Sequence, residues 1–541
     1  MRDGARARRG LAAAACAAAA LLVFLPSLRL GSLNWDDDIL VFGNPLLRAP
    51  WPALLRGAWT TAPAGAYQPL AFVVWGILGR AAGFSPFVFH AASILLHALA
   101  AGLAFLAARR LLELGLAEAG PSAIDAGAAL AALVFAVHPL RVESVSWIAE
   151  LRDPLSGVLW LAALLAYLRA RAPSSAPPKS LVATSALFAA ACLAKGTAVT
   201  FPLVLLCVDH WPLKRGLRES WREKIPLLAI SSALGAVQIA TQRGARASAA
   251  WRDHGLLARL AQTAYALVFY ARKTILPSGL SPIYELRPPL DVLEPRFLAS
   301  CAALAALVAW LRRARRDHPG VISAACAYAL MILPLSGLFQ SGSQLVADRY
   351  SYLAALPLAV LAGAALTRFS SGKRRRAAAA AAVSAVALLA AACVRQQSFW
   401  RDSETLWTRA LSIDPDSGTA LLGLGHALAS QGRVAAAAES FARARRTDRA
   451  CAADLARLLS LAREGQAESA EARRLRAALD PRPICRHAAL DYAVARAALG
   501  DYAVAREGFL AALAADPDDA VARADLRRLE RLTPPSPGKR P

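Results

Sequence analysis

Residues 33–44 read Leu-Asn-Trp-Asp-Asp-Asp-Ile-Leu-Val-Phe-Gly-Asn, and this stretch constrains how the rest of the chain is organised. Three carboxylates, Asp36, Asp37 and Asp38, follow closely after the apolar run of residues 11–28. Adjacent carboxylates repel one another and are costly in hydrocarbon, so the cluster must lie at or outside a membrane face. An acidic turn that only stops a membrane helix explains the cluster equally well, and the rest of the chain has to decide between the two.

The composition indicates a membrane protein. The 541 residues are 57% hydrophobic with a mean hydropathy of +0.39, and several apolar runs approach the ~20 residues that cross a bilayer. The net charge is +24, but much of the Lys and Arg lies in short loops between apolar runs, as in loops kept on the cytoplasmic side. This placement argues against nucleic acid as a partner.

Hydropathy and loop charge predict about 11 membrane spans. Residues 11–28 follow four arginines and would suit a signal peptide, but the length of the run favours an uncleaved signal anchor. The other spans are expected at residues 87–108, 126–146, 155–170, 180–196, 198–213, 225–241, 297–312, 319–337, 351–367 and 377–394. This count puts the N-terminus and the basic loops in the cytoplasm, and residues 36–38 and the C-terminal part outside.

Residues 261–276 are apolar but end in Arg272, Lys273 and Pro277. We expect a helix that lies on the outer interface. A twelfth span is the alternative.

The C-terminal part has helical periodicity over residues 400–531. Gly432, Gly465 and Gly500 recur at intervals of 33 and 35 residues, close to the 34-residue period of tetratricopeptide repeats. Two units carry small residues and a Phe at packing positions: Leu424, Gly425, Ala437, Phe441 and Ala444 in one, and Ala493, Ala505, Phe509, Ala512 and Pro517 in the other. The unit between them is degenerate, and a generic Ala-rich bundle is the alternative.

Cysteine usage indicates neither a metal site nor a redox pair, because the chain has no C-x-x-C motif. Cys451 and Cys485 occupy nearly equivalent places in adjacent predicted repeats. Stacked repeats lie roughly 10 Å apart, so we predict no disulfide between them.

These observations predict an all-α protein with three parts. Residues 1–397 form a polytopic membrane domain, residues 398–532 an α-solenoid of tetratricopeptide repeats, and residues 533–541 a disordered tail.

Four polar segments fall on the same predicted side as residues 36–38, and each could also have a purely structural role. Residues 138–154 contain His138, Glu143 and Arg152 and could be a hydrated loop with local ion pairs. Lys195 stands between two apolar runs and must snorkel or meet an anion. Arg272 and Lys273 suit a phosphate or any other anionic headgroup.

The fourth segment, residues 340–352, contains Asp348, Arg349, Tyr350 and Tyr352. Arg349 could bind a phosphate through two hydrogen bonds from its planar guanidinium group. An ion pair between Asp348 and Arg349 is the alternative, and the two tyrosines suit a belt at the membrane interface.

Together the segments place carboxylates and cations at one face. A carboxylate can take a proton from an acceptor hydroxyl, while cations stabilise the charge that develops on a departing phosphate. This chemistry needs no metal or other cofactor, although an aspartate pair could hold a divalent ion.

In order and spacing, these segments resemble the multi-span O-mannosyltransferase family whose members carry C-terminal tetratricopeptide repeats, and its bacterial relatives. The residues that carry the resemblance are Trp35-Asp36-Asp37 with Asn44, His138-Pro139 with Glu143 and Arg152-Asp153, Leu193-Ala194-Lys195 with Thr200, and Asp348-Arg349-Tyr350-Ser351-Tyr352-Leu353.

The resemblance implies a C-type glycosyltransferase fold and a sugar donor linked to polyprenyl phosphate. It makes Asp36 and Asp37 the candidate catalytic pair, with Asp36 first, and Arg152, Lys195 and Arg349 the candidate contacts to the donor phosphate. The other site candidates are His138, Glu143, Arg272, Lys273, Asp348 and Tyr350.

The resulting hypothesis is an inverting glycosyltransferase of the bacterial inner membrane. It would move a mannose-like sugar to hydroxyls of a periplasmic protein, and its repeats would bind the acceptor or a protein partner. The alternatives are a lipid A or envelope polysaccharide glycosyltransferase, and a non-catalytic membrane anchor for a repeat scaffold. A transporter fits less well, because transport sites lie at mid-membrane.

Overall fold

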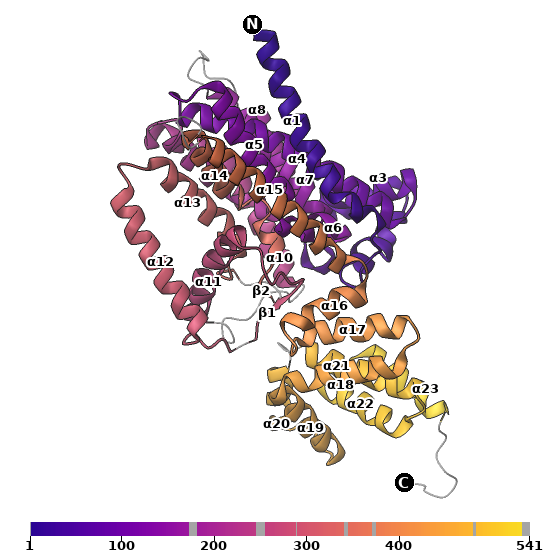
Figure 1. Cartoon of the computed structure of the whole chain (residues 1–541). Helices are drawn as coiled ribbons and strands as arrows, with labels where there is room; N and C mark the ends of the chain where they lie inside the picture. Colours follow the sequence, from indigo (N-terminus) through magenta and orange to yellow (C-terminus); the bar gives the residue numbers. More distant parts are fainter. Residues whose placement is uncertain are drawn as a thin grey trace, which may run out of the picture. The chain divides into compact units, whose positions relative to one another are not determined.

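The computed structural model describes residues 2–171, 181–244, 255–287, 289–339, 344–369, 375–479 and 483–532. The chain forms two compact units, and Figure 1 traces the elements of each. Unit 1 comprises Met1–Leu280 and Leu286–Asp402, and unit 2 comprises Ser281–Glu285 and Ser403–Pro541. Nearly all described elements are helices, and the two strands, β1 (Tyr284–Glu285) and β2 (Gln344–Val346), are short. The all-α prediction is confirmed.

The long helices of unit 1 are α1 (Arg2–Phe24), α2 (Trp51–Thr60), α3 (Pro69–Ala82), α4 (Pro86–Gly115), α5 (Pro121–Val137), α7 (Arg152–Ala170), α8 (Val182–Ala194), α9 (Phe201–His210), α10 (Leu217–Gly244), α11 (Leu256–Ile275), α12 (Pro295–Ala314), α13 (Pro319–Ile332), α14 (Leu356–Phe369) and α15 (Arg375–Gln397). Short helical turns connect them and carry most of the site described below: η1 (Leu25–Arg29), η2 (Asp38–Phe42), η3 (Pro45–Arg48), η4 (Pro63–Gly65), η5 (Pro139–Arg141), α6 (Val142–Ser146), η6 (Ile148–Leu151), η7 (Gly196–Thr200), η8 (Leu333–Leu335), η9 (Asp348–Ser351) and η10 (Ser398–Trp400).

Alanine and glycine allow the central helices of unit 1 to pack closely. α4 packs against α1, α5 and α7, and α5 packs against α14. At the α5–α14 crossing, a Cβ built on Gly363 would lie 2.3 Å from the carbonyl oxygen of Gly127, so the two backbones touch. Small residues favour close approach of helices where hydrocarbon supplies no driving force for burial.

The predicted number of membrane spans is not confirmed. Among the residues that the structure describes, six helices are long and apolar enough to cross a membrane: Ala7–Arg29, Pro86–Gly115, Ile148–Ala170, Leu217–Gln242, Pro295–Ala314 and Arg375–Trp400. A seventh results if Pro121–Val137 and Pro139–Ser146, which meet at 52°, count as one bent span. The chain is therefore a multi-pass membrane protein, and its described residues show six or seven full-length candidate spans where 11 spans were predicted.

Helix breaks account for the difference. Each predicted segment overlaps a helix, but four of them form apolar helices of only 10–17 residues: Val182–Ala194, Gly196–His210, Pro319–Leu335 and Leu356–Phe369. Alone, these are shorter than the ~20 residues that a bilayer requires. A fifth short apolar helix, Pro69–Ala82, falls outside every predicted span.

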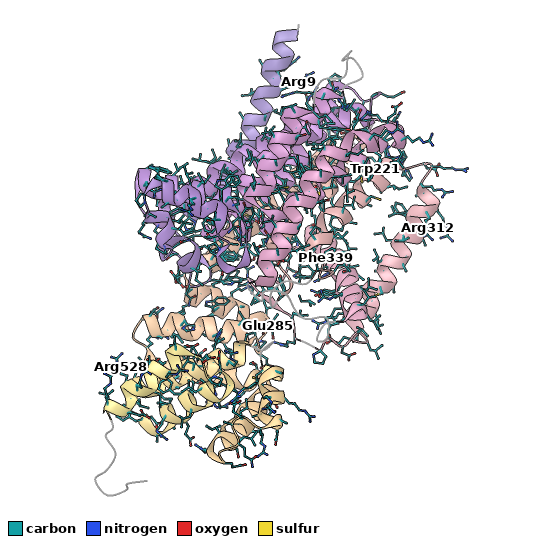
Figure 2. All side chains as sticks on the ribbon, turned by 180° about the vertical axis from the view of Figure 1, so that it is seen from behind. Arg9, Trp221, Glu285, Arg312, Phe339 and Arg528 are labelled. Atoms are coloured by element: carbon teal, nitrogen blue, oxygen red, sulfur yellow. The ribbon has the colours of Figure 1, made fainter. Side chains whose placement is uncertain are left out.

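Large apolar side chains remain exposed on the outer helices of unit 1. Examples are Trp221 and Ile225 on α10 and Leu307 and Trp310 on α12. In Figure 2, Arg9 on α1 lies near the top of unit 1, and Arg312, near the C-terminal end of α12, lies at about mid-height. Exposed apolar surface with cations near helix ends is typical of helices that face lipid.

Unit 2 contains α16 (Ser403–Ile413), α17 (Gly418–Ser430), α18 (Val434–Thr447), α19 (Arg449–Arg463), α20 (Ala470–Leu479), α21 (Pro483–Ala498), α22 (Tyr502–Ala515) and α23 (Ala520–Leu532). Gly432, Gly465 and Gly500 have φ angles between 75° and 80° and end the first helix of three successive pairs. Glycine adopts this left-handed conformation without steric cost, which explains the spacing in the sequence. The identification of these pairs as tetratricopeptide repeats stays a prediction.

The middle pair, α19 and α20, interrupts a regular stack. α18 packs against α21, while α19 packs mainly against α22 and α20. The structure has Cys451 at the start of α19 disulfide-bonded, so the prediction of no bridge at this cysteine is wrong. It assumed that Cys451 lay in a regularly stacked repeat, and α19 does not occupy that place. The side chain of Cys485 lies outside the described residues.

Candidate active site

The aspartate cluster follows the end of the first membrane helix and turns sharply. Asp36 has a φ of 27°, which is rare for a residue with a side chain. Its carbonyl oxygen accepts a hydrogen bond from the Leu40 amide at 2.7 Å, and η2 continues from Asp38 as a turn of π-helix. Strained backbone of this kind persists where surrounding contacts hold it, often at functional sites.

Asp37 is fully buried and anchors this turn. Its Oδ2 accepts a hydrogen bond from the Leu33 amide and its Oδ1 accepts one from the Ala149 amide, both at 2.9 Å. Burial raises the pKa of Asp37 to about 8, although the two amide hydrogen bonds lower it. Asp37 therefore ties the first loop to the segment around residue 149.

Asp36 is only half-buried and lies in a different electrostatic environment. Burial raises its pKa, while the positive charges of Arg152 and Arg349 lower it. Asp36 is thus the aspartate next to the predicted phosphate-binding cations. Asp38, the third member of the cluster, is exposed.

The three predicted phosphate-binding cations, Arg152, Lys195 and Arg349, converge on a single carboxylate, that of Glu150. Glu150 Oε1 lies 2.6 Å from Arg152 Nη2 and 3.4 Å from Arg349 Nε. Its Oε2 accepts a hydrogen bond from Lys195 Nζ at 2.7 Å. Glu150 is completely buried, whereas the three cations keep roughly a tenth of their side chains exposed.

Two further carboxylates complete this cluster. Arg349 Nη1 pairs with Glu143 Oε1, and Glu143 Oε2 accepts the backbone N–H of Arg349 at 2.8 Å. Lys195 Nζ lies 2.6 Å from Asp153 Oδ1, and Asp153 Oδ2 accepts a hydrogen bond from Ser144 at 2.8 Å. Three cations and three acidic side chains therefore lie in mutual contact. We call these six residues the ion cluster: Arg152, Lys195, Arg349, Glu143, Glu150 and Asp153.

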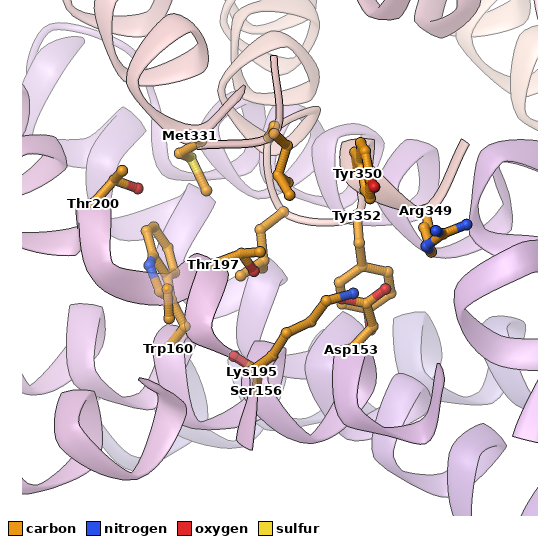
Figure 3. A pocket seen from close by; sticks show the side chains of 14 residues that line it. Asp153, Ser156, Trp160, Lys195, Thr197, Thr200, Met331, Arg349, Tyr350 and Tyr352 are labelled. Carbon is orange, nitrogen blue, oxygen red and sulfur yellow. The ribbon is translucent and has the colours of Figure 1, made fainter. Parts of the chain in front are cut away.

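A small cavity opens beside the ion cluster. Figure 3 shows the Lys195 amine and the Asp153 carboxylate close together at its wall, with Arg349 on the same side. Trp160 and Met331 line the opposite part, and Thr197 lies between. The cavity therefore joins charged groups to an apolar wall, as a lipid-linked anion requires.

Aromatic rings cover the cations. Trp35 and Trp147 stack with centroids 4.5 Å apart, and the Arg349 guanidinium lies 5.4 Å from the Trp147 ring and 5.0 Å from the Tyr350 ring. Tyr350 also lines the cavity. These rings exclude water and so strengthen the electrostatic interactions of Arg349.

Three other predicted site residues have structural contacts. His138 Nδ1 accepts a hydrogen bond from the Leu140 amide, and its Nε2 lies 3.0 Å from the Thr274 carbonyl oxygen. Lys273 is buried and donates to the carbonyl oxygens of Ser278 and Gly279. Asp348 is buried, and its carbonyl oxygen accepts a hydrogen bond from Ser351.

Arg272 is exposed on α11. It is absent from the described residues that form the ion cluster or line the cavity. Tyr352, which was expected in an interface belt, is instead buried within unit 1 and its hydroxyl lies 2.9 Å from His97 Nδ1.

Glu150 and Gln68 were not among the predicted site residues. Gln68 Oε1 accepts a hydrogen bond from Arg152 Nη1 at 3.0 Å, and Gln68 lies 84 positions away in the loop before α3. Glu150 stands two residues from Arg152, so local charge pairing was the available signal. Nothing local indicates that Lys195 and Arg349 would reach the same carboxylate.

In the part of the chain that the structure describes, no metal site built from protein side chains alone is found. No group of three or more His, Cys, Asp or Glu residues there could hold a metal ion. Both Asp37 oxygens already accept backbone hydrogen bonds.

No protein-family model matches the chain. The chain is similar to three curated proteins over part of its length. It is 33% identical over 202 residues to the protein O-mannosyl-transferase Tmtc1 of Drosophila melanogaster, covering 36% of this chain and 22% of the relative. It is 31% identical over 231 residues to human protein O-mannosyl-transferase TMTC1, covering 38% and 25%. It is 31% identical over 237 residues to Drosophila Tmtc2, covering 41% and 24%. The chain thus matches about a quarter of the length of these relatives.

Proposed function

We propose that this chain is a membrane glycosyltransferase of the protein O-mannosyltransferase type. It moves a mannose-like sugar from a polyprenyl-phosphate carrier to a hydroxyl of a protein outside the cytoplasm. The observation that carries the proposal is the convergence of Arg152, Lys195 and Arg349 beside Asp36, at a cavity with an apolar wall. The names of the similar proteins support the same reaction.

The proposed reaction is a single inverting displacement. The acceptor oxygen attacks the anomeric carbon, and the bond from that carbon to the phosphate oxygen breaks. The acceptor proton goes to Asp36 as the new bond forms. Negative charge is thereby lost at Asp36 and gained on the departing polyprenyl phosphate, where Arg152, Lys195 and Arg349 stabilise it.

Asp36 suits the role of base better than Asp37. Its side chain is partly exposed and lies near the cations, and burial raises its pKa, which makes it a stronger base. Both side-chain oxygens of Asp37 accept hydrogen bonds from backbone amides. In this proposal Asp37 holds the turn that presents Asp36.

We further propose a bacterial inner-membrane location with unit 2 in the periplasm. The disulfide bond at Cys451 supports an oxidising compartment for unit 2. The helix pairs of unit 2 would act as tetratricopeptide repeats that bind the acceptor or a partner protein.

The decisive experiment compares two variants in cells, Asp36→Asn and Asp38→Asn, at matched membrane levels. Intact-mass and glycan analysis of envelope proteins should show a mannose-like modification that Asp36→Asn reduces by about 100-fold or more, the usual contribution of a general base. Asp38→Asn removes the same charge from an exposed position and should leave the modification unchanged.

Other outcomes select the alternatives. If Asp36→Asn leaves protein glycosylation unchanged but alters the glycans of lipid A or of a polysaccharide, the acceptor is a lipid or a glycan and not a protein. If Asp36→Asn changes no glycan while deletion of residues 403–541 gives a phenotype, the chain is a scaffold and the enzyme proposal is wrong.

A further inference from the structure

Glu150 differs from the other carboxylates of the ion cluster in what holds it. Glu143 accepts a backbone N–H and Asp153 accepts a hydroxyl in addition to their cations. Among the described residues, the Glu150 side chain contacts three cations, Arg152, Lys195 and Arg349, whereas Glu143 and Asp153 each form an ion pair with one. This donor set is the one that an oxyanion of a phosphate would use.

The cations of the ion cluster already have acidic partners, and this affects how an anionic ligand can bind. Arg152, Lys195 and Arg349 each already contact at least one carboxylate before any ligand arrives. An entering phosphate must therefore compete with a carboxylate for its cations. Lys195 and Arg349 reach both Glu150 and the cavity wall, so a phosphate in the cavity would draw on the donors that Glu150 now occupies.

We propose that Glu150 is a built-in counter-ion that takes the place of the donor phosphate in the empty site and is displaced from its cations when the phosphate binds. The inference rests on the proposed function, because it takes a polyprenyl phosphate as the ligand. Glu150 keeps three like charges close together without a ligand, which would otherwise repel one another. Binding then exchanges one anion for another, and the released polyprenyl phosphate is expelled when Glu150 returns to the cations.

The test is direct binding of farnesyl phosphate, a short polyprenyl monophosphate, to the detergent-solubilised full chain by calorimetry. Glu150→Gln removes the competing charge while keeping the side-chain shape, and we expect its Kd to be about tenfold lower than that of the unmodified chain. Glu150→Asp shortens the side chain by one methylene, so it cannot reach all three cations, and its Kd should fall by about threefold.

Asp38→Asn is the matched control, because it removes one negative charge from an exposed position of the adjacent turn. It should bind like the unmodified chain. Thermal unfolding of each variant establishes that it is folded, and Glu150→Asp decides the question if Glu150→Gln does not fold.

Equal or weaker binding by the folded Glu150 variants overturns the counter-ion proposal and leaves the proposed donor intact. If the unmodified chain and all variants fail to bind farnesyl phosphate, the polyprenyl-phosphate donor is wrong and the counter-ion proposal falls with it. Tighter binding by Asp38→Asn as well would show a general charge effect, which also overturns the specific role of Glu150.

Discussion

Asp37→Asn should change how the stability of the protein depends on pH. Asp37 is fully buried, and burial raises its pKa from 3.8 to about 8. Because the folded state holds this proton more tightly than the unfolded state, stability is fully present below pH ~4 and falls as the pH rises towards ~8. With 1.36 kcal/mol for each pKa unit, the loss at pH 7 amounts to roughly 4 kcal/mol.

Asparagine has the same shape but no ionisation. Its amide nitrogen would face the N–H of either Leu33 or Ala149, each of which now donates to an oxygen of the Asp37 side chain at 2.9 Å. Losing one buried acceptor costs about 1–3 kcal/mol at every pH. The variant should therefore be less stable than the unmodified chain at pH 4 and more stable at pH 7, because the cost of protonating Asp37 on folding then exceeds the cost of the lost hydrogen bond.

The assay is thermal unfolding of the purified chain in detergent, followed by intrinsic fluorescence from pH 4 to pH 8. The transition temperature of the unmodified chain should fall across this range, while that of Asp37→Asn should stay nearly flat, so that the two curves cross. Asp38→Asn, at an exposed position, should run parallel to the unmodified chain. Parallel curves for Asp37→Asn would refute the reasoning, since they would mean that Asp37 does not ionise abnormally.

Two further variants test the packing of each unit. Gly363→Ala should destabilise unit 1 by about 2–4 kcal/mol, because its Cβ would lie 2.3 Å from the Gly127 carbonyl oxygen. Thermal unfolding measures this loss. Gly235→Ala is the control and should be neutral, because a Cβ at that position would have nothing within 4 Å. Glu285→Ala should weaken the start of α17 by about 1–2 kcal/mol, because Glu285 accepts two backbone amides and a hydroxyl there. Hydrogen exchange should speed up in α17, whereas Glu439→Ala on exposed α18 surface should not change it; equal exchange in both would contradict the capping role.

Local chemistry made much of the fold predictable. Apolar runs form helices wherever they occur, because a buried or lipid-facing backbone must satisfy its own hydrogen bonds. Every predicted span therefore overlaps a helix. The left-handed glycines at positions 432, 465 and 500 likewise follow from a local steric preference. Helix length was less predictable, because the average hydropathy of a segment does not show where a helix breaks, as it does at Lys195 and Gly196.

The sequence by itself determined which residue types are available for the proposed chemistry: a carboxylate cluster after the first helix, and cations at positions 152, 195 and 349. The tertiary structure alone decided how they are used. It buries Asp37 against two backbone amides and leaves Asp36 half-exposed, and it brings cations from distant segments onto Glu150. The reason is physical: hydropathy and steric preference act within a few residues, whereas the environment of an ionised group depends on which charges and dipoles other segments place within a few ångströms of it.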